Sequence, residues 1–365
     1  MTREKTILSF VFLSMVLSPL PLLSSQETQQ QLTVDRNQVA ELLLRSRDYA
    51  RKVEDRMQHD VLMGDIAEEL GKLGKTAEAR ETFPLIIGDR IRDGSLQSFL
   101  DDELAAEEFS EAQETIEAMT TPQGKAEALC ALASALWSAG NRYAAKKTLD
   151  EAERIFAGNR KELTNSEFLI KLARTQEEMG EKSRASNTER ELDQFSDRYT
   201  GGYRGTDEDE GRIATDQLPD NLVSGEDKNS RRDTFMRAEQ EAESLSEGHR
   251  DFALKDIVIA QASAGFIEDS LQAAAKIKDV LLKWHALHAI ALSQTQHISL
   301  EAGLKTAAQI QSEPEYELTL LEISQLLGRQ NELREVYMVV ELIHSPYLKS
   351  RAMVDAARAM CATAI

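Results

Sequence analysis

The sequence predicts an all-α fold made of helix–turn–helix repeats, and three observations lead to this prediction. Residues that favour helices, such as Ala, Leu, Glu, Gln, Arg and Lys, dominate the 365 residues, whereas aromatic residues make up only 5%. Runs of Val, Ile, Thr and Tyr that would indicate strands are largely missing. A pattern of small residues, apolar residues and one turn residue recurs at intervals in the low thirties, the length of one helical hairpin.

The clearest copy of the pattern is LCALASALWSAGNRYAAKKTLDEA, residues 129–152. Two antiparallel helices in a tight hairpin need small side chains where their backbones approach, and Ala133 and Ala145 supply them. Gly140 between them permits the positive φ that commonly ends a helix. One hairpin cannot bury both of its apolar faces, so the pattern predicts that neighbouring hairpins stack into an array.

Further copies place the turn between the two helices at regular steps. In the first half of the chain the turns fall at Gly74, Glu107, Gly140 and Gly180, with steps of 33, 33 and 40 residues. In the second half the pattern is looser, and the predicted turns are Gly265, then Ala302 or Gly303, and then Gly328. The steps there are about 32 residues, so at least seven units can be traced.

Three prolines support the repeat independently. Pro122, Pro314 and Pro346 fall where the first helix of a unit is predicted to begin. Proline is favoured in the first turn of a helix because its missing N–H has no partner there in any case. The step from Pro314 to Pro346 is 32 residues, which is the period again.

This skeleton resembles the tetratricopeptide repeat family. In the unit at 129–152 the residues at that family's signature offsets are Leu129, Leu132, Ala133, Leu136, Gly140, Tyr143, Ala145, Leu149 and Ala152. The resemblance covers residues 60–195 well and 250–365 weakly, because Leu321 and Leu333 occupy small-residue positions there. It implies a right-handed superhelix, a tetratricopeptide-like α-solenoid, that binds partners on its concave face.

The same resemblance implies which residues line the concave face. The candidate contacts with a partner are Gln97, Asp101, Ser134, Trp137, Arg174 and Glu177. The alternative interpretation of each is an ordinary solvated helix face, and for Trp137 and Trp284 a place in the core.

The pattern divides the chain into two arrays. A leading helix is predicted at 37–57, and the first array covers 35–196. Residues 197–233 are acidic, rich in Gly and lack helical periodicity, which predicts a flexible, disordered linker or long insertion. The second array covers 234–365, and its final helix, 346–362, begins a further unit. That helix either caps the array or presents an apolar face to another chain.

Residues 1–25 predict a secretory signal peptide. Arg3 and Lys5 precede an apolar run from Ile7 to Leu17, and small residues follow at Ser24 and Ser25. The protein is therefore expected in the periplasm or outside the cell. The alternative is an uncleaved membrane anchor over residues 7–23, and only then is contact with a membrane expected.

Charge and motifs exclude some classes of function. The net charge of -20 repels nucleic-acid phosphates, so no nucleic-acid partner is expected. Nucleotide-binding and hydrolase motifs are missing, and no cofactor is expected. His285 and His288, with His297 nearby, have the spacing of two metal ligands but no obvious third, so no metal site is predicted. TDEDEG at 206–211 fails the EF-hand pattern.

These observations favour an exported, non-enzymatic scaffold that binds a protein or peptide through its concave face. Two alternatives stay open: an accessory or regulatory module of an envelope enzyme or assembly complex, and an α/α-type enzyme with paired carboxylates. Cys130 and Cys361 are predicted to be two separate buried thiols. The sequence does not determine the partner or the oligomeric state.

Overall fold

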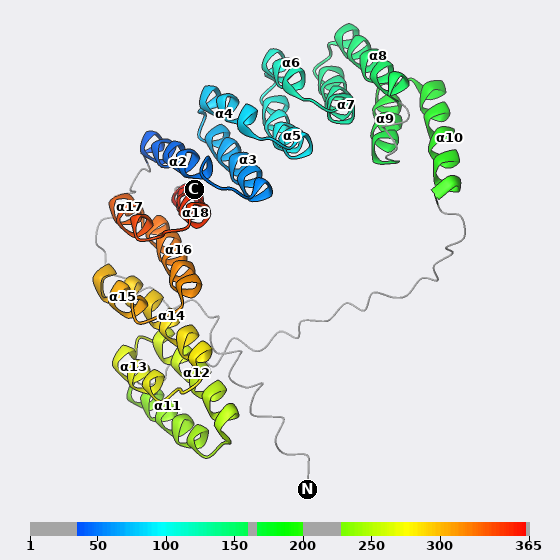
Figure 1. Cartoon of the computed structure of the whole chain (residues 1–365). Coiled ribbons are helices and arrows are strands. Elements are labelled where there is room, and N and C mark those ends of the chain that lie inside the picture. Colours follow the sequence, from blue (N-terminus) through cyan, green and yellow to red (C-terminus); the bar gives the residue numbers. More distant parts are fainter. Residues whose placement is uncertain (1–34, 160–165, 200–227, 363–365) are drawn as a thin grey trace. The chain divides into compact units, whose positions relative to one another are not determined.

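The computed structural model describes residues 35–159, 166–199 and 228–362, and the regular secondary structure of these residues is all helical (Figure 1). The all-α helical-repeat prediction is thereby confirmed. The predicted signal peptide (1–25), the alternative anchor (7–23), TDEDEG (206–211) and most of the predicted linker lie outside the described residues. The helices are α2 (Arg36–Ala50), α3 (Arg56–Lys72), α4 (Thr76–Thr82), the 3-10 turn η1 (Phe83–Leu85), α5 (Asp89–Ala105), α6 (Phe109–Ala118), α7 (Pro122–Ser138), α8 (Arg142–Gly158), α9 (Ser166–Glu178), α10 (Lys182–Tyr199), α11 (Lys228–Glu243), α12 (Glu247–Ser263), α13 (Ile267–Ala275), α14 (Val280–His297), α15 (Leu300–Ala307), α16 (Glu313–Arg329), α17 (Leu333–Glu341) and α18 (Pro346–Ala362).

The chain divides into two compact units. The N-terminal unit extends from Leu43 to Arg212, and the C-terminal unit comprises 213–365 with the residues up to Leu42. In the N-terminal unit the first helices of successive hairpins, α3, α5, α7 and α9, pack each against the next, and each packs against its own second helix (Figure 1). In the C-terminal unit α12, α14, α16 and α18 do the same, with α13, α15 and α17 as second helices.

The hairpins repeat with a period of 33 residues, which is more regular than the sequence suggested. The residues that immediately precede the first helices are spaced by 33 within each unit: Asp55, Gly88 and Thr121, and then Ser246, Asp279, Ser312 and Ser345. Pro122 and Pro346 are the first residues of their helices, whereas Pro314 is the second residue of α16. The 32-residue step between the last two prolines is therefore one short of the true period.

The turn residues confirm most of the predicted register and correct its end. A positive φ occurs at Gly74, Glu107, Gly140, Gly180, Gly265 and Asn331. The last hairpin thus turns at Asn331, and the prediction of Gly328 is wrong by three residues. Ile298 occupies the equivalent place between α14 and α15, with a φ of -122°, so the turn is at neither Ala302 nor Gly303.

Gly303 and Gly328 serve a different purpose from the turn glycines, because both lie inside helices that touch a neighbour closely. A Cβ on Gly328 would lie 2.6 Å from the carbonyl oxygen of Ala356 in α18. A Cβ on Gly303 would lie 2.7 Å from the carbonyl oxygen of Ala291 in α14. Close backbone approach therefore requires both glycines.

The corrected register also removes the apparent departures in the last hairpin. Seven residues before the turn, Ser324 is fully buried at the place that Ala133 occupies in α7. Leu321 and Leu333 therefore do not occupy small-residue positions, as had been predicted.

Three predicted boundaries differ from the structure. The helix predicted at 37–57 ends at Ala50, and α3 begins at Arg56 after its N-cap residue Asp55, whose carboxylate accepts the N–H of Gln58 at 2.8 Å. At the edges of the predicted linker 197–233, α10 extends to Tyr199 and α11 begins at Lys228.

Candidate functional site

The six residues predicted to contact a partner lie on α5, α7 and α9, the adjacent first helices of the N-terminal unit. We call them the first-helix face: Gln97, Asp101, Ser134, Trp137, Arg174 and Glu177. Asp101, Ser134 and Arg174 occupy one register, each six residues before the turn residue of its hairpin. Asp101, Arg174 and Glu177 are exposed, and the other three are half-buried.

Part of this face is joined across the helix boundary by a residue that sequence reasoning missed. Ser134 Oγ in α7 donates a hydrogen bond to Glu178 Oε2 in α9 at 2.5 Å, and Arg174 Nε donates to Glu178 Oε1 at 3.1 Å. Glu178 therefore links Ser134 to Arg174. It immediately follows the predicted Glu177, which points to solvent, so the pattern found the helix face but selected the wrong carboxylate.

The other members of the face have partners within their own hairpins. Gln97 Nε2 donates to Asp101 Oδ1 at 2.9 Å, one turn along α5. The guanidinium carbon of Arg142 in α8 lies 3.6 Å from the centre of the Trp137 ring, a cation–π contact. Tyr143, one of the residues at signature offsets, is 83% exposed and contributes little to the packing of the hairpin.

The structure reveals a second recurring set of polar residues, which we call the capping carboxylates. Each lies five residues after the residue that precedes its first helix, and each accepts two backbone N–H groups at the start of the next first helix. Asp60 accepts from Ile87 and Gly88, Asp93 from Thr120 and Thr121, Asp251 from Lys278 and Asp279, and Glu317 from His344 and Ser345. A carboxylate at a helix start satisfies N–H groups that have no partner within the helix.

The electrostatics of the capping carboxylates reflect these bonds. Burial by itself would raise the pKa of Asp60, but the N–H of Ile87, the side chain of His59 and the N–H of Gly88 outweigh it and lower that pKa. Burial likewise opposes the hydrogen bonds that Asp251 accepts from Asp279, Arg250 and Lys278, and the net pKa of Asp251 is also lowered. Both groups are therefore held as carboxylates by the next hairpin.

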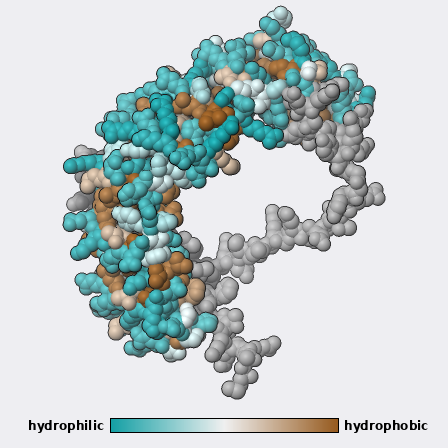
Figure 2. Space-filling view, viewed as in Figure 1, coloured by the Kyte–Doolittle hydropathy of each residue, from teal (hydrophilic) through white to brown (hydrophobic). Residues whose placement is uncertain are grey.

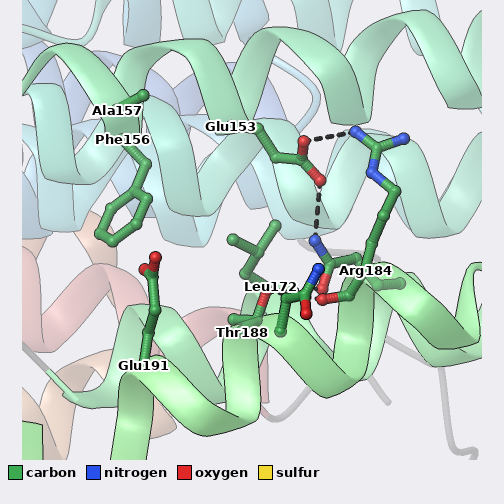
Figure 3. Close-up of a pocket in the computed structure, with 9 residues that line it drawn as sticks. Glu153, Phe156, Ala157, Leu172, Arg184, Thr188 and Glu191 are labelled. Carbon is green, nitrogen blue, oxygen red and sulfur yellow. Dashed lines mark hydrogen bonds and ion pairs between the residues drawn. The ribbon is translucent and has the colours of Figure 1, made fainter. Parts of the chain in front are cut away.

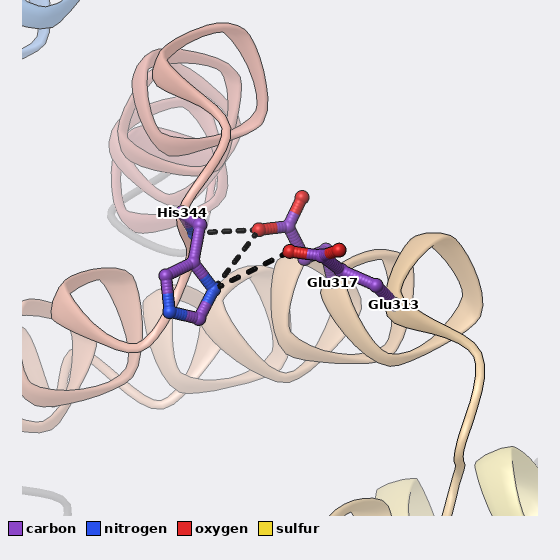
Figure 4. Close-up of side chains that lie close together, drawn as sticks. All are labelled: Glu313, Glu317 and His344. Atoms are coloured by element: carbon purple, nitrogen blue, oxygen red, sulfur yellow. Dashed lines mark hydrogen bonds and ion pairs between the residues drawn. The ribbon is translucent and has the colours of Figure 1, made fainter.

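One capping carboxylate belongs to a cluster with the residue types of a metal site. Glu313, Glu317 and His344 present ligand atoms within 4.8 Å of one another (Figure 4). His344 Nδ1 lies 3.6 Å from Glu317 Oε1 and 3.9 Å from Glu313 Oε1, but that same Glu317 oxygen accepts the N–H groups of His344 at 2.5 Å and Ser345 at 3.0 Å. Its lone pairs are thus used for helix capping, as in Asp60, Asp93 and Asp251, so capping accounts for this cluster.

The histidines and cysteines singled out in the sequence have ordinary surroundings. His288 Nδ1 lies 2.9 Å from Thr319 Oγ1, and its Nε2 lies 3.2 Å from Glu322 Oε2, both in α16, whereas His285 is exposed. Cys130 is buried, Cys361 is half-buried, and both are free. Burial raises the pKa of the Cys130 thiol to about 12, which keeps it protonated.

A pocket of about 230 Å³ lies between α8, α9 and α10 (Figure 3). Its polar lining is crossed by Glu153 of α8, which accepts from Gln176 Nε2 at 2.7 Å and pairs with Arg184. The remaining lining residues are Phe156, Ala157, Leu172, Asn187, Thr188 and Glu191. None of the six predicted contact residues lines it, so the first-helix face and this pocket are two separate sites.

No protein-family model matches the chain, and no curated protein matches it. A solved structure that it resembles is the crystal structure of Ton1535 from Thermococcus onnurineus NA1, with 14% sequence identity and a TM-score of 0.25, over 88% of this chain and 99% of that chain. A likeness at this TM-score carries no argument about fold or function. The resemblance to the tetratricopeptide repeat family stays a prediction. Among the described residues, no helix combines the length and the apolar composition that a membrane span requires.

Proposed function

We propose that the protein is an exported, non-enzymatic scaffold of the tetratricopeptide-like kind, which binds a protein or peptide partner on the first-helix face of its N-terminal unit. The observation that supports this most is the shared register of Asp101, Ser134 and Arg174 on three adjacent helices. Stacked repeats that expose equivalent positions form an extended surface, and such a surface suits an extended ligand.

The chemistry of the face favours a polar partner with a local apolar contact. Asp101, Arg174, Glu177 and Glu178 offer charges of both signs, and Trp137 offers an aromatic surface. Figure 2 shows that the visible side of the N-terminal unit is largely hydrophilic with a few apolar patches. Tryptophan and arginine are the residue types that most often dominate the energy of protein interfaces.

The test is affinity capture from an envelope fraction, followed by measurement of the captured partner's affinity for variants of the chain. Asp101→Arg and Arg174→Glu reverse exposed charges on the face, and we expect each to weaken binding about tenfold or more. The matched controls are Asp102→Arg, the next residue of α5, and Arg154→Glu on α8, which are exposed and lie outside the face. The controls should leave the affinity unchanged.

Two outcomes would count against the proposal. One is the absence of any reproducible partner with the wild-type chain. The other is an equal loss of affinity in the face variants and in their controls, because binding would then depend on net charge and not on this surface.

A further inference from the structure

The pocket at α8–α10 arises where the 33-residue period is broken. The step from Gly140 to Gly180 is 40 residues, seven more than the period. α8 has 17 residues, whereas α6, the second helix of the preceding hairpin, has 10. The additional turns of α8 carry Glu153, Phe156 and Ala157, which form one wall of the pocket (Figure 3).

The C-terminal unit contains the same polar arrangement without the pocket. Gln261, four residues before the turn residue Gly265, donates from Nε2 to Glu239 Oε1 of the preceding helix α11 at 2.8 Å. Gln176, four residues before Gly180, donates in the same way to Glu153 of α8 at 2.7 Å. Both pairs join a buried glutamine of a first helix to a glutamate of the long helix before it.

In the C-terminal unit a lysine of the chain completes this arrangement. Lys276 Nζ lies 2.9 Å from Glu239 Oε2 and 3.0 Å from Glu243 Oε1. Lys276 follows Gly265 by eleven residues, and Glu243 follows Glu239 by one helical turn. The ammonium group is therefore held by two carboxylates that lie on one face of α11.

The equivalent positions in the N-terminal unit carry different residues. Eleven residues after Gly180 the chain has Glu191 in place of a lysine, and four residues after Glu153 it has Ala157 in place of a second glutamate. Both Glu191 and Ala157 line the pocket. The space that an internal lysine fills in one unit is thus left open in the other, and a carboxylate has been moved to its opposite wall.

We propose that this pocket binds a basic side chain, lysine or arginine, of a peptide partner. The aliphatic stem contacts Phe156, Ala157 and Leu172, and the cationic head faces Glu153 and Glu191. The local charge favours a cation, because Asp150, Glu153 and Glu191 outnumber the one guanidinium, Arg184, that pairs with the first two. A volume of about 230 Å³ suits one side chain better than a drug-sized ligand.

This site goes beyond the first-helix face, because it lies on another side of α9. Leu172, which lines the pocket, precedes Arg174 of the face by two residues, or about 200° around the helix. A single extended peptide on the first-helix face does not reach the pocket from there. Its occupation is therefore a separate anchoring event, and it can succeed or fail independently of that face.

The experiment measures binding of short blocked peptides to the full chain by ligand-observed NMR. The probes are acetyl-Gly-Xaa-Gly-amide peptides with lysine, arginine, norleucine or glutamate at the central position. We expect the lysine and arginine peptides to bind at least about tenfold more tightly than the other two. Equal binding of the glutamate peptide, or no binding of the basic peptides, would overturn the proposal.

Two variants locate the binding in the pocket. Glu191→Lys supplies an internal ammonium at the position of Lys276, and Ala157→Phe fills the space from an exposed position of α8. Both should abolish binding of the lysine peptide. The matched controls are Glu151→Lys on α8 and Ser138→Phe at the end of α7, which lie outside the pocket and should bind as the wild type does. Retained binding in Glu191→Lys and Ala157→Phe would place the peptide elsewhere and reject the site.

A last comparison separates a peptide ligand from a free amine. Binding of 1,5-diaminopentane more tightly than the lysine peptide would overturn the assignment to a peptide. Loss of peptide binding in Ala157→Phe with an unchanged response to Arg174→Glu would show that this site acts independently of the first-helix face.

Discussion

Asp93 of α5 accepts the backbone N–H of Thr121, the residue that precedes α7, at 2.7 Å, and it accepts the N–H of Thr120 at 2.8 Å. The Thr121 hydroxyl, which itself accepts the N–H of Gly124, also donates to the same carboxylate at 2.5 Å. One side chain of a hairpin therefore fixes where the next hairpin begins. The same relationship recurs at Asp60, Asp251 and Glu317.

Replacing Asp93 by alanine should destabilise the N-terminal unit. The substitution removes two charge-assisted hydrogen bonds and leaves the N–H groups of Thr120 and Thr121 without this acceptor, at a cost of about 2–3 kcal/mol. Urea unfolding followed by circular dichroism measures the change. Asp102→Ala, at an exposed position of the same helix, is the control and should change the free energy of unfolding by less than about 0.5 kcal/mol.

The capping carboxylates should make stability depend on pH in the acid range. The pKa values of Asp60 and Asp251 are lowered from the ordinary value of 3.8. A carboxyl whose pKa is lower in the folded state stabilises the fold above its unfolded pKa, and this contribution is lost as the pH falls through that value to the folded one. We expect the free energy of unfolding to decrease from about pH 5 downward.

Comparison with variants isolates the part of this pH dependence that is due to capping. Asp60→Asn and Asp251→Asn should each be less stable than the wild type at pH 7 and should lose less stability between about pH 5 and pH 2. Parallel pH profiles for the wild type and both variants would show that other carboxyl groups control acid unfolding.

Two glycines should respond in opposite directions to alanine. Gly303→Ala should cost about 1–3 kcal/mol, because its Cβ would collide with the Thr295 side chain and the Ala291 carbonyl. Gly94→Ala, inside α5 with nothing within 4 Å of a Cβ, should stabilise by about 0.5–1 kcal/mol. Thermal unfolding of both variants tests the pair, and destabilisation by Gly94→Ala would contradict the packing described for α5.

The junction between α14 and α16 should open more readily than its neighbours. The capping position of α14 holds Trp284 instead of a carboxylate, so Gln311 and Ser312 receive no such acceptor from it. Native-state hydrogen exchange at these two amides should be about tenfold faster than at Lys278 and Asp279, which Asp251 holds. Equal protection at both junctions would mean that packing alone fixes the start of each helix.

The sequence was sufficient to predict the fold class, because the period and the small residues follow directly from how two helices pack. It placed the last turn wrongly because glycine has two uses. Gly328 allows α16 to approach α18 closely, whereas the turn itself uses Asn331, another residue that tolerates a positive φ. A search for a fixed period of 33, anchored on Gly265, would have found Asn331.

The candidate sites were less predictable from the sequence. The face on α5, α7 and α9 follows from helical register, but its link through Glu178 depends on side-chain geometry that one residue of register decides. The pocket was signalled by the 40-residue step alone. Its chemistry became visible only when the surroundings of Glu191 could be compared with those of Lys276 in the other unit. The capping carboxylates do have a sequence signal, an acid five residues after the helix start.

The capping bond joins a side chain of one hairpin to main-chain groups of the next, and this makes the hairpins interchangeable parts. Any sequence that begins a helix at the right distance offers the same two N–H groups to Asp60, Asp93 or Asp251. A gene duplication or deletion of 33 codons would therefore join hairpins at a ready-made junction. The array can grow or shrink by whole units during evolution without new residues having to arise at the seam.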